Sequence, residues 1–306
     1  MSDKVQQSVY SDCVTYAKSR IDFNNFNTFN NVSRICIVTG ASGSMGAEAV
    51  RSLVSEGDRV IMACRNAAKA DAVRKEIIKE NPSSEIEIAE LDLSSLASVR
   101  RFAESLSGEK PDALFNNAGV INRDYKLTED GYENTLSTNY LGPCLLTRLL
   151  LPSMPSGSHI VNMVSLTCRF GSVDRTFFSR GEERFSQLGT YSDTKLAFLL
   201  FSVALGSRVS DIYVNVADPG IVNSNMISMD RWFDSLADLF FRPLCKKPAD
   251  GVAPALKALE TDTFLHCYKG KGHRPIAARY FSHPSLEWLW EETERIIGRW
   301  SLIPPV

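Results

Sequence analysis

Several features that would place a protein in another class are scarce or missing in this chain. Its 34 Lys and Arg residues are balanced by 36 Asp and Glu, so it has no basic excess of the kind that binds nucleic acid or anionic membranes. The four histidines lack metal-ligand spacing. The seven cysteines are an odd number without a Cys-x-x-Cys pair, which favours reduced thiols inside a cell. This composition favours a small-molecule partner over nucleic acid or a metal.

Long hydrophobic runs are also missing. The longest apolar stretch, Ala197 to Leu205, is too short to cross a bilayer, and Met1 to Ser33 has no long apolar core typical of a secretory signal. We therefore expect a soluble, cytoplasmic protein without a transmembrane segment. The sequence leaves open whether it forms a homo-oligomer.

The first 33 residues form a predicted N-terminal extension. Residues 4–20 have the spacing of an amphipathic helix, with apolar positions at Val5, Val9, Cys13 and Tyr16. An Asn- and Phe-rich linker, residues 22–31, follows. Such a helix either packs on its own domain or contacts a partner or second subunit. Residues 34–306 are predicted to form one catalytic domain.

Strand and helix patterns alternate along this predicted domain. Strands are expected at residues 35–39, 59–64, 85–91, 112–116, 159–164, 212–217 and 277–281. Each of the six intervals between these strands contains a helical pattern. This alternation predicts an α/β fold, a single Rossmann-type doubly wound domain with a seven-stranded, mostly parallel sheet. Pro254 stands inside the helical pattern 249–259, where we expect a kink or a late helix start.

A glycine-rich turn follows the first predicted strand. The run from Arg34 to Val38 is apolar and β-branched, as expected of a parallel strand buried on both faces. Glycines at 40, 43 and 46 would let the backbone turn sharply and approach a pyrophosphate at the start of the next helix. The alternative is an ordinary strand-to-helix turn.

A Tyr and a Lys four residues apart stand far downstream of that turn. Tyr191 and Lys195 would share one face of a helix, where an ammonium beside a phenol favours the ionised phenol. A proton donor that must also become a base near neutral pH benefits from that neighbour. The pair alone could be a surface pair, so its weight comes from the order of glycine turn, Ser165, Tyr191 and Lys195.

With these motifs together, the chain from Arg34 to Gly298 resembles the short-chain dehydrogenase/reductase family. The resemblance also rests on Leu91-Asp92-Leu93, Asn116-Asn117-Ala118-Gly119, Asn139 and Asp218-Pro219-Gly220. Within the family it is most similar to the retinol dehydrogenase and protochlorophyllide reductase branch, through Ala63-Cys64-Arg65-Asn66, the long interval between Ser165 and Tyr191, and Tyr280-Phe281 followed by Leu289-Trp290.

The resemblance implies a redox enzyme with a defined set of site residues. Tyr191 would act as general acid in ketone or aldehyde reduction, Lys195 would lower its pKa and hold the nicotinamide ribose, and Ser165 would bond the substrate oxygen. Asn139 resembles the proton-relay Asn of the family. The implied cofactor contacts are Gly40, Ser42, Gly43, Ser44, Met45, Gly46, Arg65, Asp92, Leu93, Asn116, Ala118, Gly119, Tyr191, Lys195, Pro219, Gly220 and Ser224.

Two details modify the cofactor prediction. The branch usually has glycine where this chain has Ser44, which bears on which amides would contact the pyrophosphate and on whether the Ser44 hydroxyl adds a hydrogen bond. Arg65 follows the second strand, where a guanidinium suits a 2′-phosphate and favours NADP(H) over NAD(H); it could instead stack on adenine or point to solvent. Asp92 and Asn116 could equally be turn or cap residues.

Two segments carry substrate information. Residues 222–247 lie where the family has its mobile substrate lid, and Trp232, Phe233, Phe240 and Phe241 make them strongly aromatic. These rings predict a bulky lipophilic carbonyl or alcohol, such as a retinoid or steroid, unless they fill the core or an interface. Residues 166–190 form a second insertion near the site. The rival interpretation of the whole chain is a non-catalytic NADP(H)-binding scaffold or redox sensor.

Overall fold

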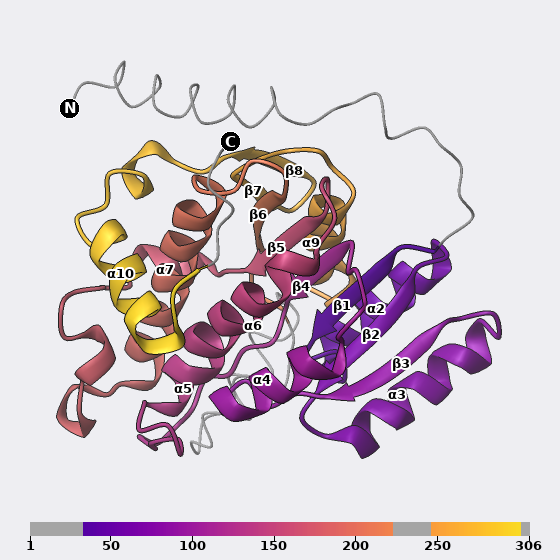
Figure 1. Cartoon of the computed structure of the whole chain (residues 1–306), viewed down its shortest axis with the longest axis horizontal. Helices are drawn as coiled ribbons and strands as arrows, with labels where there is room; N and C mark the ends of the chain where they lie inside the picture. The colour runs from indigo at the N-terminus through magenta and orange to yellow at the C-terminus, as the bar shows by residue number, and fades with distance from the viewer. Residues whose placement is uncertain (1–32, 223–245, 301–306) are drawn as a thin grey trace.

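The structure is a computed structural model that describes residues 33–222 and 246–300. In this part of the chain a single eight-stranded sheet has the order β3-β2-β1-β4-β5-β6-β7-β8 (Figure 1). Seven strands are parallel and β8 is antiparallel to β7. The strands are β1 (Ile35–Thr39), β2 (Arg59–Cys64), β3 (Ile86–Glu90), β4 (Ala113–Asn116), β5 (His159–Met163), β6 (Tyr213–Asp218), β7 (His266–Lys269) and β8 (Gly272–Pro275).

Helices cover both faces of this sheet, as expected for a doubly wound fold. One face packs against α2 (Ser44–Ser55), α3 (Ala67–Glu80) and α9 (Pro248–Leu259). The other packs against α4 (Leu96–Ser105), α6 (Gly142–Leu150), α7 (Gln187–Gly206) and α10 (Leu286–Ile297). A short helix α5 (Asn134–Leu136) and a π-helical turn (Ser137–Leu141) lead directly into α6. The predicted α/β fold is confirmed.

The last predicted strand is wrong. Residues 278–280 form a 3-10 turn rather than a strand, and their apolar character reflects packing of Tyr280 and Phe281 against the core. The edge of the sheet is instead the hairpin of β7 and β8, whose two-residue turn begins at Gly270 with a φ of +58°. Glycine tolerates that left-handed conformation, which is typical of tight hairpin turns. The sheet therefore has eight strands instead of the seven predicted.

Helix α9 and the segments outside the described residues bear on further sequence predictions. Helix α9 begins at Pro248 and runs through Pro254 to Leu259. Of the two expectations for Pro254, a late helix start is wrong, and a kink stays a prediction. The predicted amphipathic helix, most of the 222–247 lid and Ser224 lie outside the described residues. The chain on either side of that segment is joined, because Val222 and Lys246 form a parallel bridge.

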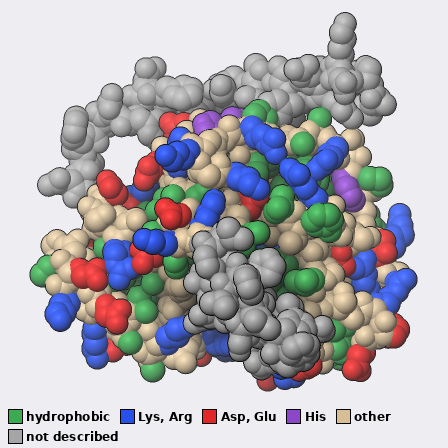
Figure 2. All heavy atoms as spheres, turned by 180° about the vertical axis from the view of Figure 1, so that it is seen from behind, with side chains coloured by type: hydrophobic (Ala, Val, Ile, Leu, Met, Phe, Trp, Pro, Cys, Tyr) green, Lys and Arg blue, Asp and Glu red, His purple; other side chains and the backbone are tan. Residues whose placement is uncertain are grey.

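The described surface carries charges of both signs, mixed with hydrophobic side chains (Figure 2). No helix in residues 33–222 and 246–300 is long and apolar enough to span a membrane. The right-handed crossovers of the fold bring the carboxyl ends of the parallel strands to one edge of the sheet. The glycine turn after β1, Ser165 after β5 and Pro219 after β6 all lie at that edge.

Candidate active site

The glycine turn after β1 is held in shape by its own backbone. Gly40 has a φ of +63°, and its amide donates to the carbonyl of Ala63 at 2.9 Å. The Gly43 amide donates to the Gly40 carbonyl at 2.9 Å, and Gly43 then caps helix α2. A Cβ on Gly46 would lie 2.4 Å from the Gly40 carbonyl oxygen, so the helix can pack this closely against the turn only because residue 46 is glycine. The first turn of α2 has no side-chain cap, which leaves its amides available to an anion.

Thr39, at the end of β1, ties this turn to the loop that follows β4. Its hydroxyl accepts from the Ala118 amide at 3.0 Å, and its carbonyl accepts from Asn117 Nδ2 at 2.8 Å. A Cβ on Gly40 would meet Ala118 at 3.0 Å, so the two segments are also in close contact. The glycine turn and the loop at residues 116–119, both predicted to contact the cofactor, therefore form one unit.

Ser165 and Tyr191 lie together at the carboxyl edge. Ser165 follows β5, and its hydroxyl accepts from the Thr167 amide at 3.2 Å. It also lies beside the Tyr191 phenol. Burial raises the pKa of Tyr191 to about 12, and hydrogen bonding by the Ser165 side chain acts in the opposite direction. The phenol is therefore protonated near neutral pH.

Lys195 lies one helical turn after Tyr191 on the same face of α7. Its ammonium is 5.8 Å from the centre of the Tyr191 ring and donates to the Met163 carbonyl at 2.8 Å. Burial lowers the pKa of Lys195 to about 8. Burial therefore dominates the pKa of both groups, in opposite directions. The expected lowering of the Tyr191 pKa by Lys195 stays a prediction.

Asn139 completes the group from the π-helical turn. Its side-chain amide is 1% exposed and makes two bonds with the backbone of Val120, at 2.7 and 2.9 Å. It also donates to the Thr194 hydroxyl at 3.3 Å. A Cβ on Gly119 would lie 3.4 Å from Lys195 Nζ and 3.5 Å from Asn139 Oδ1, so Gly119 leaves the space between them open. π-Helical turns within α-helices are frequent at functional sites.

The other predicted cofactor residues surround this group with different orientations. Arg65 is exposed at the end of β2 and has no ion-pair partner among the described residues. The Asp92 carboxylate accepts two bonds from Ser94, in the manner of a turn residue. The Asn116 amide points inward, bonded to Thr147 and Asn162. Ser42 lies beside the Cys64 thiol and acts to lower its pKa, although burial raises that pKa overall. Ser44 is exposed, and the Gly220 amide donates to Asp218.

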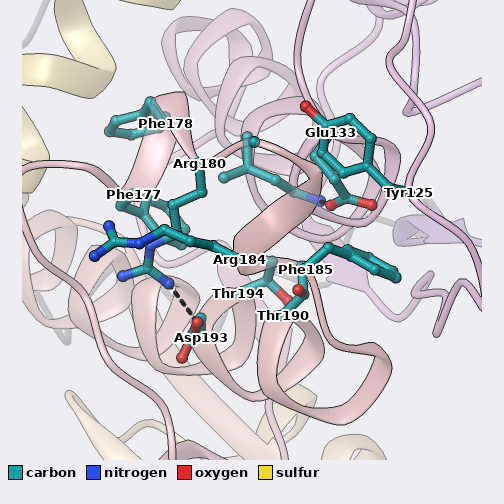
Figure 3. Close-up of a pocket in the computed structure, with 12 residues that line it drawn as sticks. Tyr125, Glu133, Phe177, Phe178, Arg180, Arg184, Phe185, Thr190, Asp193 and Thr194 are labelled. Atoms are coloured by element: carbon teal, nitrogen blue, oxygen red, sulfur yellow. Dashed lines mark hydrogen bonds and ion pairs between the residues drawn. The ribbon is translucent and has the colours of Figure 1, made fainter.

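The 166–190 insertion forms a fixed wall beside α7. Figure 3 shows Arg180 reaching Asp193 of α7, with Phe177 and Phe178 beside it, around a small cavity. Phe177 also packs edge-on against Tyr140 at 5.7 Å between ring centres. A Cβ on Gly171 would lie 2.4 Å from the Ser192 carbonyl, so the insertion lies directly on the helix that carries Tyr191.

A larger cavity of about 480 Å³ opens beside Ser165. It lies between the start of the insertion, β7, β8 and the 3-10 turn at 278–280. Its floor includes Leu199 and Ile276, and its volume is in the range of small-molecule sites. The sequence analysis missed the β7–β8 side of this cavity because it predicted no strand between residues 217 and 277. The Gly270-Lys271 pair between two short strands was the available signal for the hairpin.

The strand order and the glycine turn define a doubly wound α/β fold of the dinucleotide-binding type, and Ser165, Tyr191, Lys195 and Asn139 gather at its carboxyl edge. The short chain dehydrogenase family model matches residues 34–232. This chain belongs to that family, and it is an oxidoreductase that acts on CH–OH and C=O groups with a nicotinamide cofactor.

Named relatives match most of the chain. Human retinol dehydrogenase 12 is 33% identical over 259 residues, which are 83% of this chain and 78% of that protein. Human retinol dehydrogenase 13 is 35% identical over 277 residues, 86% of this chain and 84% of that protein. A crystal structure of an uncharacterised protein from Mycobacterium paratuberculosis has a TM-score of 0.69 at 29% identity, covering 90% of this chain and 97% of that one.

Proposed function

We propose that residues 34–306 form an NADP(H)-dependent oxidoreductase that interconverts a ketone or aldehyde with an alcohol on a lipophilic substrate such as a retinoid or steroid. The observation that carries the proposal is the Ser165–Tyr191 pair, with Lys195 beneath the Tyr191 ring and Asn139 beside Lys195. These four side chains come from three separate segments. They meet at the edge where doubly wound sheets bind their ligands.

Proton transfer follows from the hydrogen bonds of this group. The Ser165 hydroxyl accepts from the Thr167 amide, so its own proton is free for the Tyr191 oxygen or for a substrate oxygen. The Tyr191 phenol keeps its proton near neutral pH because its pKa is about 12. It can therefore deliver that proton to an oxygen that gains negative charge during reduction. The reverse reaction uses the same phenol as acceptor.

A proton from solvent must replace the one that Tyr191 gives up, and Lys195 and Asn139 have different parts in this step: Lys195 orders the groups that carry it, and Asn139 positions the backbone. The Lys195 ammonium uses one proton for Met163, which leaves two for ribose hydroxyls or a water near Gly119. Its positive charge stabilises a phenolate formed during turnover, even though burial dominates the resting pKa of Tyr191. Asn139 is fixed through both atoms of its amide, so it holds the Val120 backbone and the α7 face in register.

The residues fit a nicotinamide dinucleotide, which supplies the hydride when bound. The uncapped first turn of α2 suits a pyrophosphate, and the buried Asn117 Oδ1 has no partner within the described chain. Arg65 is exposed and without a carboxylate partner at the place where a 2′-phosphate would lie, which supports NADP(H). A structure from Shigella flexneri with 21% identity and a TM-score of 0.61 was solved with NADP.

The experiment that tests the proposal is reduction of aldehydes and ketones followed by NADPH absorbance. Tyr191→Phe removes only the transferable proton, so we expect turnover to fall by about 10²- to 10⁴-fold while NADPH affinity stays nearly unchanged. Lys195→Ala should impair both. Tyr125→Phe, which lines the separate small cavity beside the insertion, is the matched control.

Retention of more than about a tenth of the wild-type rate by Tyr191→Phe would contradict the assigned role. Binding of NADPH without turnover of any carbonyl would instead favour the non-catalytic scaffold.

A further inference from the structure

We propose that the substrate of this site carries an anionic group, which binds at a rim of arginines on the cavity beside Ser165. This inference rests on the proposed oxidoreductase function and adds a chemical class to its substrate. The rim consists of Arg169, Arg274 and Arg279, all of which line the cavity and are exposed. We call these three residues the arginine rim.

The three arginines come from separate segments that converge on this one opening. Arg169 ends the 3-10 turn (Leu166–Arg169) that follows Ser165. Arg274 lies on β8 opposite Cys267, and Arg279 belongs to the 3-10 turn at 278–280. Burial raises the pKa of the Cys267 thiol, whereas Arg274, Lys269 and Arg169 each act to lower it. These positive charges therefore converge on one wall of the cavity.

Within residues 33–222 and 246–300, carboxylates do not neutralise the arginine rim. Asp218 is the only acidic residue of this part of the chain that lines the cavity, and Lys269 holds it at 2.8 Å. The Asp218 carboxylate also accepts from the Gly220 amide at 2.9 Å. Among the described residues, neither Arg169 nor Arg274 has an ion-pair partner. Clustered positive charges of this kind are stabilised by an anion that binds between them.

The interior of the same cavity is apolar. Val164 and Ile276 are buried in its walls, and Leu199 is 6% exposed on its floor. Arg279 lies over the Tyr280 ring, 4.8 Å from its centre, so this guanidinium is held at the rim. A ligand that fits has an oxygen at Ser165, an apolar body over Leu199 and an anion at the arginine rim. A lipophilic aldehyde or ketone with a carboxylate or phosphate at its far end has this pattern.

The test compares three aldehydes with the same medium-length chain and different far ends. A medium-chain ω-oxo fatty acid, its methyl ester and the corresponding ω-oxoalkyl phosphate are reduced by the full chain with NADPH. We expect the acid or the phosphate to have a kcat/KM at least about tenfold above that of the ester. Whichever of the two is favoured identifies the anion as carboxylate or phosphate. Added salt should reduce the difference.

Two variants connect that preference to the rim. Arg169→Gln and Arg274→Gln, when combined, should raise KM for the anionic substrate by about 10- to 100-fold and change KM for the ester much less. Arg274→Lys should restore part of the preference, because it keeps the charge and loses the planar fork. The control is Arg175→Gln, an exposed arginine of the same insertion that does not line the cavity.

The outcomes distinguish failure of the anionic-substrate proposal from failure of the proposed oxidoreductase function. Equal kcat/KM for acid, phosphate and ester, or a preference that survives both rim variants, would overturn the anionic-substrate proposal. Reduction of the ester that depends on Tyr191 would still support the proposed oxidoreductase function. Failure to reduce any of the three aldehydes overturns the aldehyde reductase and the anionic substrate together.

Discussion

Single residues determine what this site can bind, and Arg65 is the clearest case. It is exposed at the end of β2 and has no ion-pair partner in the described chain. We predict that Arg65→Asp weakens NADPH binding by roughly 1.5–3 kcal/mol, the cost of losing one charge-assisted contact, and improves NADH binding. A carboxylate repels a 2′-phosphate and accepts bonds from ribose hydroxyls. Fluorescence titration of both nucleotides measures the effect.

The control for this exchange is Arg101→Asp, which reverses the charge of another exposed arginine, on α4. It should leave both affinities unchanged apart from a small effect of net charge. Equal NADPH affinity in wild type and Arg65→Asp would show that the guanidinium points to solvent.

The residues that the sequence identifies best are those whose chemistry depends on local spacing. Tyr191 and Lys195 share a helix face because they are four apart, and a helix delivers that geometry without help from the rest of the fold. The effect on the Tyr191 pKa could not be predicted, because it depends on burial by segments far away in sequence. For the same reason, the bonds of Asn139 to Val120 and Thr194 have no local signal.

At the scale of elements, helix α2 depends on the absence of a side chain at Gly46. Ala at this position would be the better helix former by up to about 1 kcal/mol. Its Cβ, however, would stand 2.4 Å from the Gly40 oxygen and 2.7 Å from Ala41 Cα, both of which are backbone atoms. Overpacking of this kind costs about 1–3 kcal/mol, so we predict a net loss of stability and a weaker pyrophosphate site for Gly46→Ala.

Urea unfolding and NADPH titration measure the two effects. Gly272→Ala is the matched exchange, since a Cβ there meets nothing within 4 Å and the residue has no positive φ. If Gly46→Ala binds NADPH as tightly as Gly272→Ala, the turn can open without cost and does not define the phosphate site.

Strands with a continuous apolar run were predicted well, whereas elements with little hydrophobic signal of their own were not. Strands β1, β2 and β5 are almost continuously buried, and their apolar runs identify them. The β7–β8 hairpin has only one fully buried residue, Tyr268, and β8 is exposed along its length. Its sequence therefore carries little hydrophobic signal, whereas Tyr280 and Phe281 carry more and are not in a strand.

At the scale of the whole molecule, one buried hydrogen bond joins the C-terminal helix to the segment that holds Asn139. Tyr140 is fully buried, and its hydroxyl lies 2.7 Å from Thr293 Oγ1 on α10. The Thr293 hydroxyl donates to the Leu289 carbonyl at 2.6 Å, so it accepts from Tyr140. We predict that Thr293→Val removes the oxygen partner of a buried phenol, leaves it only the weakly bonding Cys144 thiol, and costs about 1–3 kcal/mol of stability.

Thr293→Ser keeps the hydroxyl and loses one methyl group, so it should cost about 0.8 kcal/mol. Equilibrium unfolding compares the two variants. A loss for Thr293→Ser as large as that for Thr293→Val would assign the effect to packing rather than to the hydrogen bond.

The two edge strands of the sheet limit how copies of this chain can associate. β8 ends in His273, Arg274 and Pro275, and at the opposite end of the sheet β3 presents Glu87 and Glu90 to solvent. Proline lacks the amide that a new strand would need, and exposed charges along an edge oppose strand addition. The sheet is therefore protected at both ends against edge-to-edge aggregation, and any self-association in solution should use helical or loop surfaces.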